Sequence, residues 1–235
     1  MLVINMWINV GLILGAYIYG STPFVWSIAR LRGIDLRQRS SRSVGSANLT
    51  QSAGAWAGAL GGVGDFSKGV LPIVIGHYLL DADLPILCLS GLAALAGQMW
   101  PVWLGFYGGR GNSVSGGIIV GFILSSYLPW GILLVLIPIF LAIAKRKLSP
   151  AKDTPTMSVP LACLLGFALV PLLTWLWGKP QVISFTFTAV VLLLITRRLT
   201  ADISADLRRK PRDHKVAVML INRFLYDRNY KDRYR

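Results

Sequence analysis

Seven stretches rich in apolar residues run along this chain, and each is long enough, or nearly so, to cross a bilayer as a helix. They cover residues 3–28, 55–80, 84–104, 114–126, 128–144, 157–177 and 182–195. A spanning helix needs about 20 apolar residues. Only 14% of the residues are charged and 54% are hydrophobic, whereas soluble domains carry about 25% charged residues. The sequence therefore predicts an all-α, polytopic membrane protein with seven transmembrane helices.

The basic residues predict how these helices are oriented. Cytoplasmic loops of membrane proteins carry an excess of Lys and Arg. With the N-terminus outside and the C-terminus in the cytosol, 22 of the 24 basic residues lie on the cytosolic side, Lys68 lies in the membrane and Lys179 lies outside. Six spans would leave either the cluster at residues 30–42 or the basic C-terminal tail outside. We expect residues 1–196 to form the membrane domain and residues 197–235 to form a cytosolic tail.

The net charge of +14 does not indicate a nucleic-acid partner. Twelve basic residues follow Ile195, and most others lie in short loops between apolar stretches. This placement favours anionic membrane lipids as the partner, because each basic residue near such a surface contributes about 1 kcal/mol. A possible amphipathic segment covers residues 216–225. The tail is either solvated near anionic lipid or a docking element for another membrane protein.

A glycine-rich loop, Gly108-Gly109-Arg110-Gly111, lies between the third and fourth apolar stretches. Glycines allow an anion to approach the backbone N–H groups. The guanidinium of Arg110 has a planar fork of donors that matches phosphate. The loop is therefore either a tight turn with a charge that keeps it cytosolic or a cradle for phosphate.

Further polar residues cluster on the same predicted side of the membrane. Ser46 and Asn48 follow the first span, and the segment from Arg197 to Asp202 begins the tail. Together with the glycine-rich loop they could frame one cytosolic pocket for an anionic substrate. Within the second span, Asp65 and Lys68 are three residues apart, so they share a helix face and can pair. Charges at membrane depth are candidates for function, although a structural ion pair is an equal alternative.

The usual catalytic groups are scarce in this sequence. The histidines are His77 and His214, and the ten acidic residues are all Asp. Two cysteines and two histidines, far apart in the chain, do not form the ligand spacing of a metal site. We expect no metal or organic cofactor.

Five motifs, in order along the chain, carry a family resemblance. They are Gly20-Ser21-Thr22-Pro23-Phe24, Gly33-Ile34-Asp35-Leu36-Arg37, Gly45-Ser46-Ala47-Asn48, Asp65-Phe66-Ser67-Lys68-Gly69 with Pro72, and Gly97-Gln98-Met99-Trp100-Pro101-Val102-Trp103-Leu104 leading through Phe106 to the glycine-rich loop. They resemble Gly-Ser-x-Pro-Phe, Gly-x-Asp-x-Arg, Gly-Ser-Gly-Asn, Asp-x-x-Lys-Gly-x-x-Pro, and Gly-His-x-Phe-Pro-x-Phe followed by Gly-Gly-Lys-Gly. These are motifs of the bacterial acyl-phosphate:glycerol-3-phosphate acyltransferases, the PlsY family. The resemblance extends to about Leu207.

The resemblance implies an enzyme of phospholipid synthesis in the bacterial inner (plasma) membrane. Such an enzyme moves the acyl group of an acyl phosphate to glycerol 3-phosphate, giving lysophosphatidic acid and phosphate, without a metal or coenzyme A. By position, the catalytic residues would be Ser46 and Asn48, which would help to hold the substrate, and Arg110, which would steady charge on the phosphate. Phosphate would be bound by Gly108, Gly109, Gly111 and Arg42. The pocket would be braced by Asp65, Lys68 and Asp202.

The chain also departs from the family motifs. About five residues are missing after Asn48, where the family continues Gly-Ala-Thr-Asn before an arginine, and Gln51 stands where that arginine would be. Gln98 replaces a histidine, and residues 197–203 lack the His and Glu of the third motif. These departures leave open a catalytically degenerate relative that serves as a subunit or lipid-binding partner of a membrane complex. A transporter of phosphorylated solutes is a further alternative.

Overall fold

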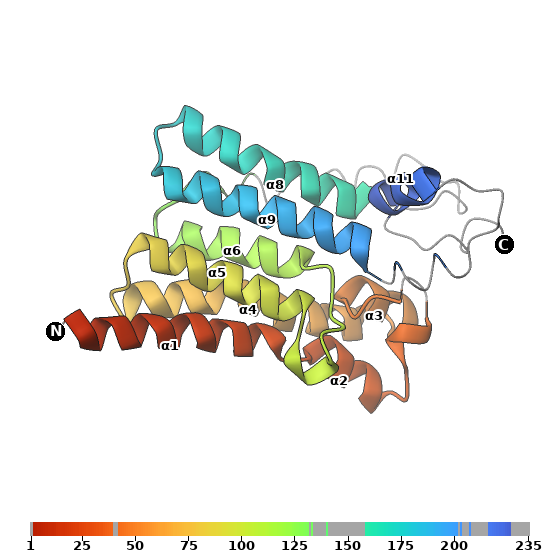
Figure 1. The fold of residues 1–235 in the computed structure, drawn as a ribbon. Helices are drawn as coiled ribbons and strands as arrows, with labels where there is room; N and C mark the ends of the chain where they lie inside the picture. The colour runs from red at the N-terminus through yellow and green to blue at the C-terminus, as the bar shows by residue number, and fades with distance from the viewer. Residues whose placement is uncertain are drawn as a thin grey trace.

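The computed structural model describes residues 2–39, 42–131, 133, 140, 158–201, 203, 207 and 216–226, and this part of the chain is built mainly from helices (Figure 1). The elements are α1 (Leu2–Ser21), α2 (Phe24–Leu31), η1 (Leu36–Gln38), α3 (Ser46–Ala53), α4 (Ala55–Tyr78), α5 (Leu84–Met99), η2 (Val102–Leu104), α6 (Asn112–Leu124), α8 (Ser158–Leu176), α9 (Gln181–Thr200) and α11 (Val216–Tyr226). The all-α prediction is confirmed for these residues.

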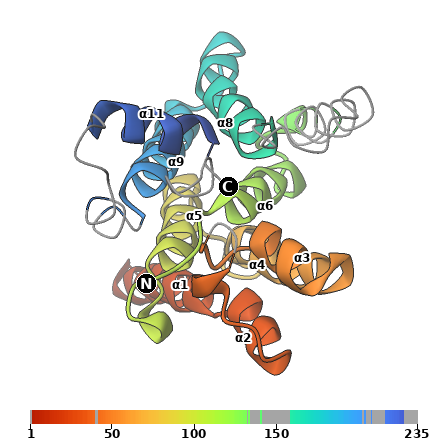
Figure 2. The same cartoon turned by 90° about the vertical axis from the view of Figure 1, so that its right-hand side faces the viewer.

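Helix α5 lies in the middle of the bundle (Figure 2). It packs against α1, α4, α6 and α9, and α8 covers α9 from outside. Its side chains Leu87, Ala94, Leu95 and Met99 are fully buried. The helix begins at Leu84 with Pro85 in its first turn, where a missing N–H does no harm.

Glycines let two pairs of helices approach closely. A Cβ added to Gly97 would lie 2.2 Å from the carbonyl oxygen of Tyr17, so α1 and α5 touch backbone to backbone. A Cβ added to Gly117 would lie 2.1 Å from the carbonyl oxygen of Phe66, which joins α4 and α6 in the same way. Small residues at such contacts are typical of membrane helices, whose association depends on close packing.

Among the described residues, four helical segments are long and apolar enough to cross a membrane. They are Ile4–Leu31, Ala55–Tyr78, Leu84–Leu104 and Gln181–Thr200. Two shorter apolar helices, Asn112–Leu124 and Cys163–Leu176, coincide with two further predicted spans. The predicted span at 128–144 lies largely outside the described residues. The membrane character of the chain is thus confirmed, while the count of seven stays a prediction.

Two boundaries differ from the predicted spans in an informative way. The first span is divided at Thr22 and Pro23, because Pro23 has no N–H with which to continue the helix. The last span continues beyond residue 195 to Thr200 and takes Arg197 and Arg198 into the helix. Both arginines are buried, so they do not simply extend into solvent.

The two ends of the bundle differ in content. One end carries the turns at residues 79–83 and 177–180, and there Trp130 and Trp177 lie with ring centroids 4.4 Å apart. The other end, on the right of Figure 1, carries α2, α3 and α11. The connection from α5 to α6, which contains the glycine-rich loop, lies at this second end.

Candidate active site

Three buried polar side chains form a hydrogen-bonded ring between α4 and α5. Lys68 Nζ donates to Asp65 Oδ1 at 2.8 Å and also to Gln98 Oε1. Gln98 Nε2 donates to Asp65 Oδ2 at 2.9 Å. Lys68 is 1% exposed and Asp65 2%, and charges so deeply buried are found only when paired. The predicted pairing of Asp65 with Lys68 is confirmed, and Gln98 completes it.

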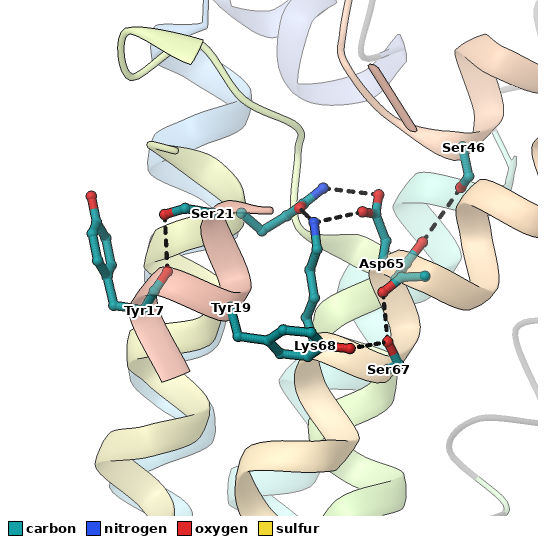
Figure 3. A network of polar contacts seen from close by, with 10 residues as sticks. Tyr17, Tyr19, Ser21, Ser46, Asp65, Ser67 and Lys68 are labelled. Carbon is teal, nitrogen blue, oxygen red and sulfur yellow. Dashed lines mark hydrogen bonds and ion pairs between the residues drawn. The ribbon is translucent and has the colours of Figure 1, made fainter. Parts of the chain in front are cut away.

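The break between α1 and α2 packs around this ring. Figure 3 shows Tyr19 reaching toward Ser67, the residue beside Lys68, and their hydroxyl oxygens lie 2.7 Å apart. The ring of Phe24 lies against Lys68, with 5.3 Å between its centroid and Nζ. The break between α1 and α2 thus brings Phe24 to Lys68 and Tyr19 to the neighbouring Ser67. A pocket of about 210 Å³, partly open to solvent, lies between this break and the glycine-rich loop.

The glycine-rich loop lies directly on Gln98. The N–H of Gly109 donates to the carbonyl oxygen of Gln98 at 3.0 Å. A Cβ on Gly108 would lie 2.3 Å from that same oxygen, and a Cβ on Gly109 would lie 2.8 Å from Gln98 Nε2. Both glycines are therefore needed for close packing. Because the Gly109 N–H is bonded within the protein, that donor does not face a ligand.

Arg197 holds the opposite side of the loop. Its Nη2 donates to the carbonyl oxygen of Gly108 at 3.1 Å and its Nε to that of Gly109 at 3.3 Å. The guanidinium carbon lies 5.7 Å from the ring centroid of Trp100. The sequence analysis predicts Arg197 at the start of the tail, near the pocket, but it predicts no contact between Arg197 and this loop. Its position at the end of an apolar helix is the one signal that could have indicated burial.

A second pocket lies on the far side of the glycine-rich loop. It holds about 220 Å³, part of it open to solvent, and its lining residues are Arg110, Asn112, Leu164, Leu194 and Arg198. Gly111, with φ of 87°, precedes the first turn of α6 and provides no side-chain cap. Two guanidinium groups therefore share this pocket with the start of a helix, where N–H groups point outward and favour an anion.

Ser46 lies where two helices begin. Its Oγ is 3.5 Å from Oγ of Ser113, in the first turn of α6. Ser46 itself opens α3, and the preceding residue, Gly45, provides no side-chain cap. Ser113 was not among the predicted site residues, although it directly follows the glycine-rich loop and Asn112 in the sequence.

Asn48 is buried and fully bonded within its own loop. Its Nδ2 lies within hydrogen-bonding distance of the carbonyl oxygens of Leu36, Arg39 and Ser43, at 3.0, 3.1 and 2.8 Å. Its Oδ1 accepts from Ser52 Oγ at 3.2 Å. The side chain therefore fixes the segment that leads into α3, and its amide has no donor left for a substrate.

Two predicted residues remain, Arg42 and Asp202. Arg42, in a left-handed conformation with φ of 55°, accepts a hydrogen bond from the Tyr107 hydroxyl on its carbonyl at 3.1 Å. That bond ties its loop to the connection between α5 and α6. Gln51 is exposed on α3. Asp202 lies outside the described residues. Within the described ranges no three His, Cys, Asp or Glu side chains come together as metal ligands.

Fold and site together define a helical membrane protein with an arginine-rich pocket at one end of its bundle. A family model described as "Glycerol-3-phosphate acyltransferase" matches residues 10–208. Among curated relatives, the glycerol-3-phosphate acyltransferase of Aquifex aeolicus (strain VF5) is 38% identical over 147 residues, which cover 63% of this chain and 74% of that protein. That of Geobacter metallireducens (strain ATCC 53774 / DSM 7210 / GS-15) is 31% identical, over 82% of this chain and 92% of that protein.

Solved structures are similar as well. The glycerol 3-phosphate form of PlsY (YgiH), an integral membrane glycerol 3-phosphate acyltransferase, has a TM-score of 0.68 and 27% identity, covering 89% of this chain and 98% of that one. Its lysophosphatidic acid form has a TM-score of 0.65 at 27% identity, covering 88% of this chain and 94% of that one. This chain belongs to the glycerol-3-phosphate acyltransferase family.

Proposed function

We propose that this chain transfers an acyl group from an acyl phosphate to glycerol 3-phosphate and so makes lysophosphatidic acid for phospholipid synthesis. Membership of the family and the likeness to PlsY in its glycerol 3-phosphate and lysophosphatidic acid forms support the acceptor and the product. The acyl phosphate donor is part of the proposal and rests on the motif resemblance. We also propose that the chain crosses the bacterial inner membrane seven times, with its N-terminus outside and the site in the cytosol.

One observation carries the assignment of the site. Arg110 and Arg198 line a pocket at the start of α6. Arg110 belongs to the glycine-rich loop, which Gln98 and Arg197 hold from opposite sides. A guanidinium matches phosphate through paired donors, and a helix N-terminus favours negative charge. A phosphate group is the part of either substrate that such a pocket would bind.

The chemistry of the reaction fits fixed positive charge. The 1-hydroxyl of glycerol 3-phosphate attacks the acyl carbon, an ester bond forms, and the bond from that carbon to the phosphate oxygen breaks. The hydroxyl proton ends on the phosphate that leaves. Negative charge develops on the carbonyl oxygen and on the departing phosphate, and preorganised donors stabilise such charge most effectively. We assign this role to Arg110. Asp65 and Lys68, closed by Gln98, brace the loop.

The bonding of Asn48 favours a revised match to the first family motif. Asn48 holds its own loop, as a structural residue does. Gly45-Ser46-Ala47-Asn48 can be matched to Gly-Ala-Thr-Asn instead of Gly-Ser-Gly-Asn. The gap of about five residues then closes, and Gln51 still aligns with the arginine of the family motif. Ser40-Ser41-Arg42-Ser43 then takes the place of Gly-Ser-Gly-Asn. We propose Ser41, which lies outside the described residues, as the substrate-binding serine, with Ser46 as a neighbour of the site.

The experiment uses the full-length chain purified in detergent and reconstituted into liposomes. It is given palmitoyl phosphate and labelled glycerol 3-phosphate, and lysophosphatidic acid is measured. Palmitoyl-coenzyme A serves as the contrasting donor, and Arg110→Ala serves as the site variant. We expect lysophosphatidic acid with palmitoyl phosphate as the donor and none with palmitoyl-coenzyme A. The rate of product formation should fall on the order of 100-fold in Arg110→Ala. A monodisperse, folded chain that makes no product overturns the proposal.

A second candidate function rests on Gln51. An exposed neutral amide stands where the family motif has an arginine, which would suit a degenerate relative that binds lipid within a membrane complex. The same assay decides between the two. Absence of product, together with a partner that co-purifies in fixed ratio, would favour this second function.

A further inference from the structure

Helix α11 lies beyond the family match, which ends at residue 208, yet it packs against the rest of the protein. Figure 2 shows it beside α8 and α9 at the end of the bundle, and it contacts α9. Met219 and Arg223 are each 2% exposed, and Phe224 packs on the main hydrophobic core. Ile221, on the other face, is 56% exposed. This segment of the tail is therefore a docked amphipathic helix.

The end of α9 presents two neighbouring arginines in different directions. Arg197 donates to the carbonyls of the glycine-rich loop, as described above. Arg198 instead meets α11, where its Nε donates to the carbonyl oxygen of Arg223 at 3.4 Å. The guanidinium carbon of Arg198 also lies 6.0 Å from the ring centroid of Phe224.

Arg198 is at the same time a wall of the arginine-rich pocket, which it shares with Arg110 and Asn112. It is buried between this pocket and α11. A backbone carbonyl and an aromatic face restrict a side chain that otherwise has many rotamers. The contacts made by α11 therefore act on a guanidinium that lines the proposed phosphate site.

We propose that α11 is a positioning element of the acceptor site, which holds Arg198 so that its guanidinium binds the phosphate of glycerol 3-phosphate. This inference rests on the proposed function and deepens it. The helix contributes through Arg223, by its carbonyl, and through Phe224, by its ring. Neither residue need touch the substrate. The acceptor site of this chain is thus completed by a segment outside the part that matches the family.

The test detaches α11 without removing it. The variant Met219→Asp/Phe224→Ala places a carboxylate in the buried face and deletes the ring against Arg198. Ile221→Asp, the same change on the exposed face of the same helix, is the matched control. We expect the KM for glycerol 3-phosphate to rise about ten-fold in the double variant, because Arg198 regains rotamer freedom. The KM for palmitoyl phosphate and the behaviour of the control should stay within two-fold of the parent chain.

A second set of variants separates positioning from a general loss of structure. In an Arg198→Ala background the detaching changes should add less than two-fold to the KM for glycerol 3-phosphate, because the residue they act on is already gone. The KM for glycerol 3-phosphate should rise less in Arg198→Lys than in Arg198→Ala. A full additive effect in the Arg198→Ala background, or an equal rise in the KM for both substrates, overturns the proposal.

Direct binding distinguishes this inference from the proposed function. Calorimetric titration of the full chain with glycerol 3-phosphate requires no turnover. Weaker binding in the double variant than in the Ile221→Asp control supports the role of α11 even if no acyl transfer is found. Acyl transfer with unchanged glycerol 3-phosphate affinity in the double variant leaves the function standing and overturns the inference.

Discussion

The carbonyl oxygen of Gln98 accepts the N–H of Gly109 at 3.0 Å, while the side chain of Gln98 bonds both members of the buried pair formed by Asp65 and Lys68. One residue of α5 thus links the charges inside the bundle to the loop at its end. A shift of Gln98 would therefore move both the charged pair and the glycine-rich loop. A motif position where the family carries a histidine here holds an amide that donates and accepts at once.

Replacing Gln98 with Leu should destabilise the protein and lower activity together. The change leaves Asp65 and Lys68 with unsatisfied hydrogen-bonding capacity in a buried site, which costs about 3 kcal/mol for bonds to charged groups. Thermal unfolding in detergent, followed by circular dichroism, measures the loss. Gln38→Leu is the matched control, since Gln38 donates to Asp35 at 3.4 Å on the exposed surface. Equal melting temperatures for the two variants would contradict the structural role of Gln98.

Adding a methyl group to Gly109 should cut the rate of acyl transfer on the order of 100-fold, the scale expected when a reacting group shifts by about 1 Å. The new Cβ would lie 2.8 Å from Gln98 Nε2 and 2.8 Å from the carbonyl oxygen of Val44, so the loop must move. Gly15→Ala is the control, because a Cβ there meets no atom within 4 Å. Initial rates with palmitoyl phosphate report the effect, and a Gly109→Ala enzyme with wild-type rate would remove the loop from the site.

The helices and the local charge pair could be predicted because their signals are close together in sequence. Apolar stretches mark the spans, and the spacing of Asp65 and Lys68 places both on one helix face. Contacts between distant segments could not be predicted in this way. The two hydrogen bonds from Arg197 to the glycine-rich loop join residues that are 88 and 89 positions apart. No local pattern indicates which carbonyl a buried arginine will reach.

The same limit explains the role first assigned to Asn48. An asparagine in a polar loop has the same local sequence whether it faces a ligand or holds its own backbone. Only the fold brings the carbonyls of Leu36, Arg39 and Ser43 around its amide. The docking of α11 is a similar case, since its amphipathic pattern fits a membrane surface as well as the face of α9.

The two serines that compete for the substrate role can be separated by one substitution each. Under the revised match, Ser41→Ala removes a donor to the substrate and should lower kcat on the order of 100-fold. Ser46→Ala removes a hydroxyl that lies 3.5 Å from the Ser113 hydroxyl and should lower kcat by less than about five-fold, because that contact is long for a hydrogen bond. Both variants are assayed at saturating palmitoyl phosphate. The reverse order of effects would restore the original match, in which Ser46 holds the substrate.

The proposed orientation predicts that Asp83 is accessible from outside the cell and that Arg39 is not. Asp83, in the turn before α5, and Arg39, in the loop before α3, are both exposed and lie at opposite ends of the bundle. Each is changed to Cys in a chain whose own cysteines, Cys88 and Cys163, are replaced by Ala. In intact bacterial spheroplasts a membrane-impermeant maleimide should label Asp83→Cys at once and Arg39→Cys only after permeabilisation, because basic loops are retained in the cytosol. Labelling of Arg39→Cys in intact spheroplasts would place the arginine-rich pocket outside the cell, away from cytosolic phosphorylated substrates.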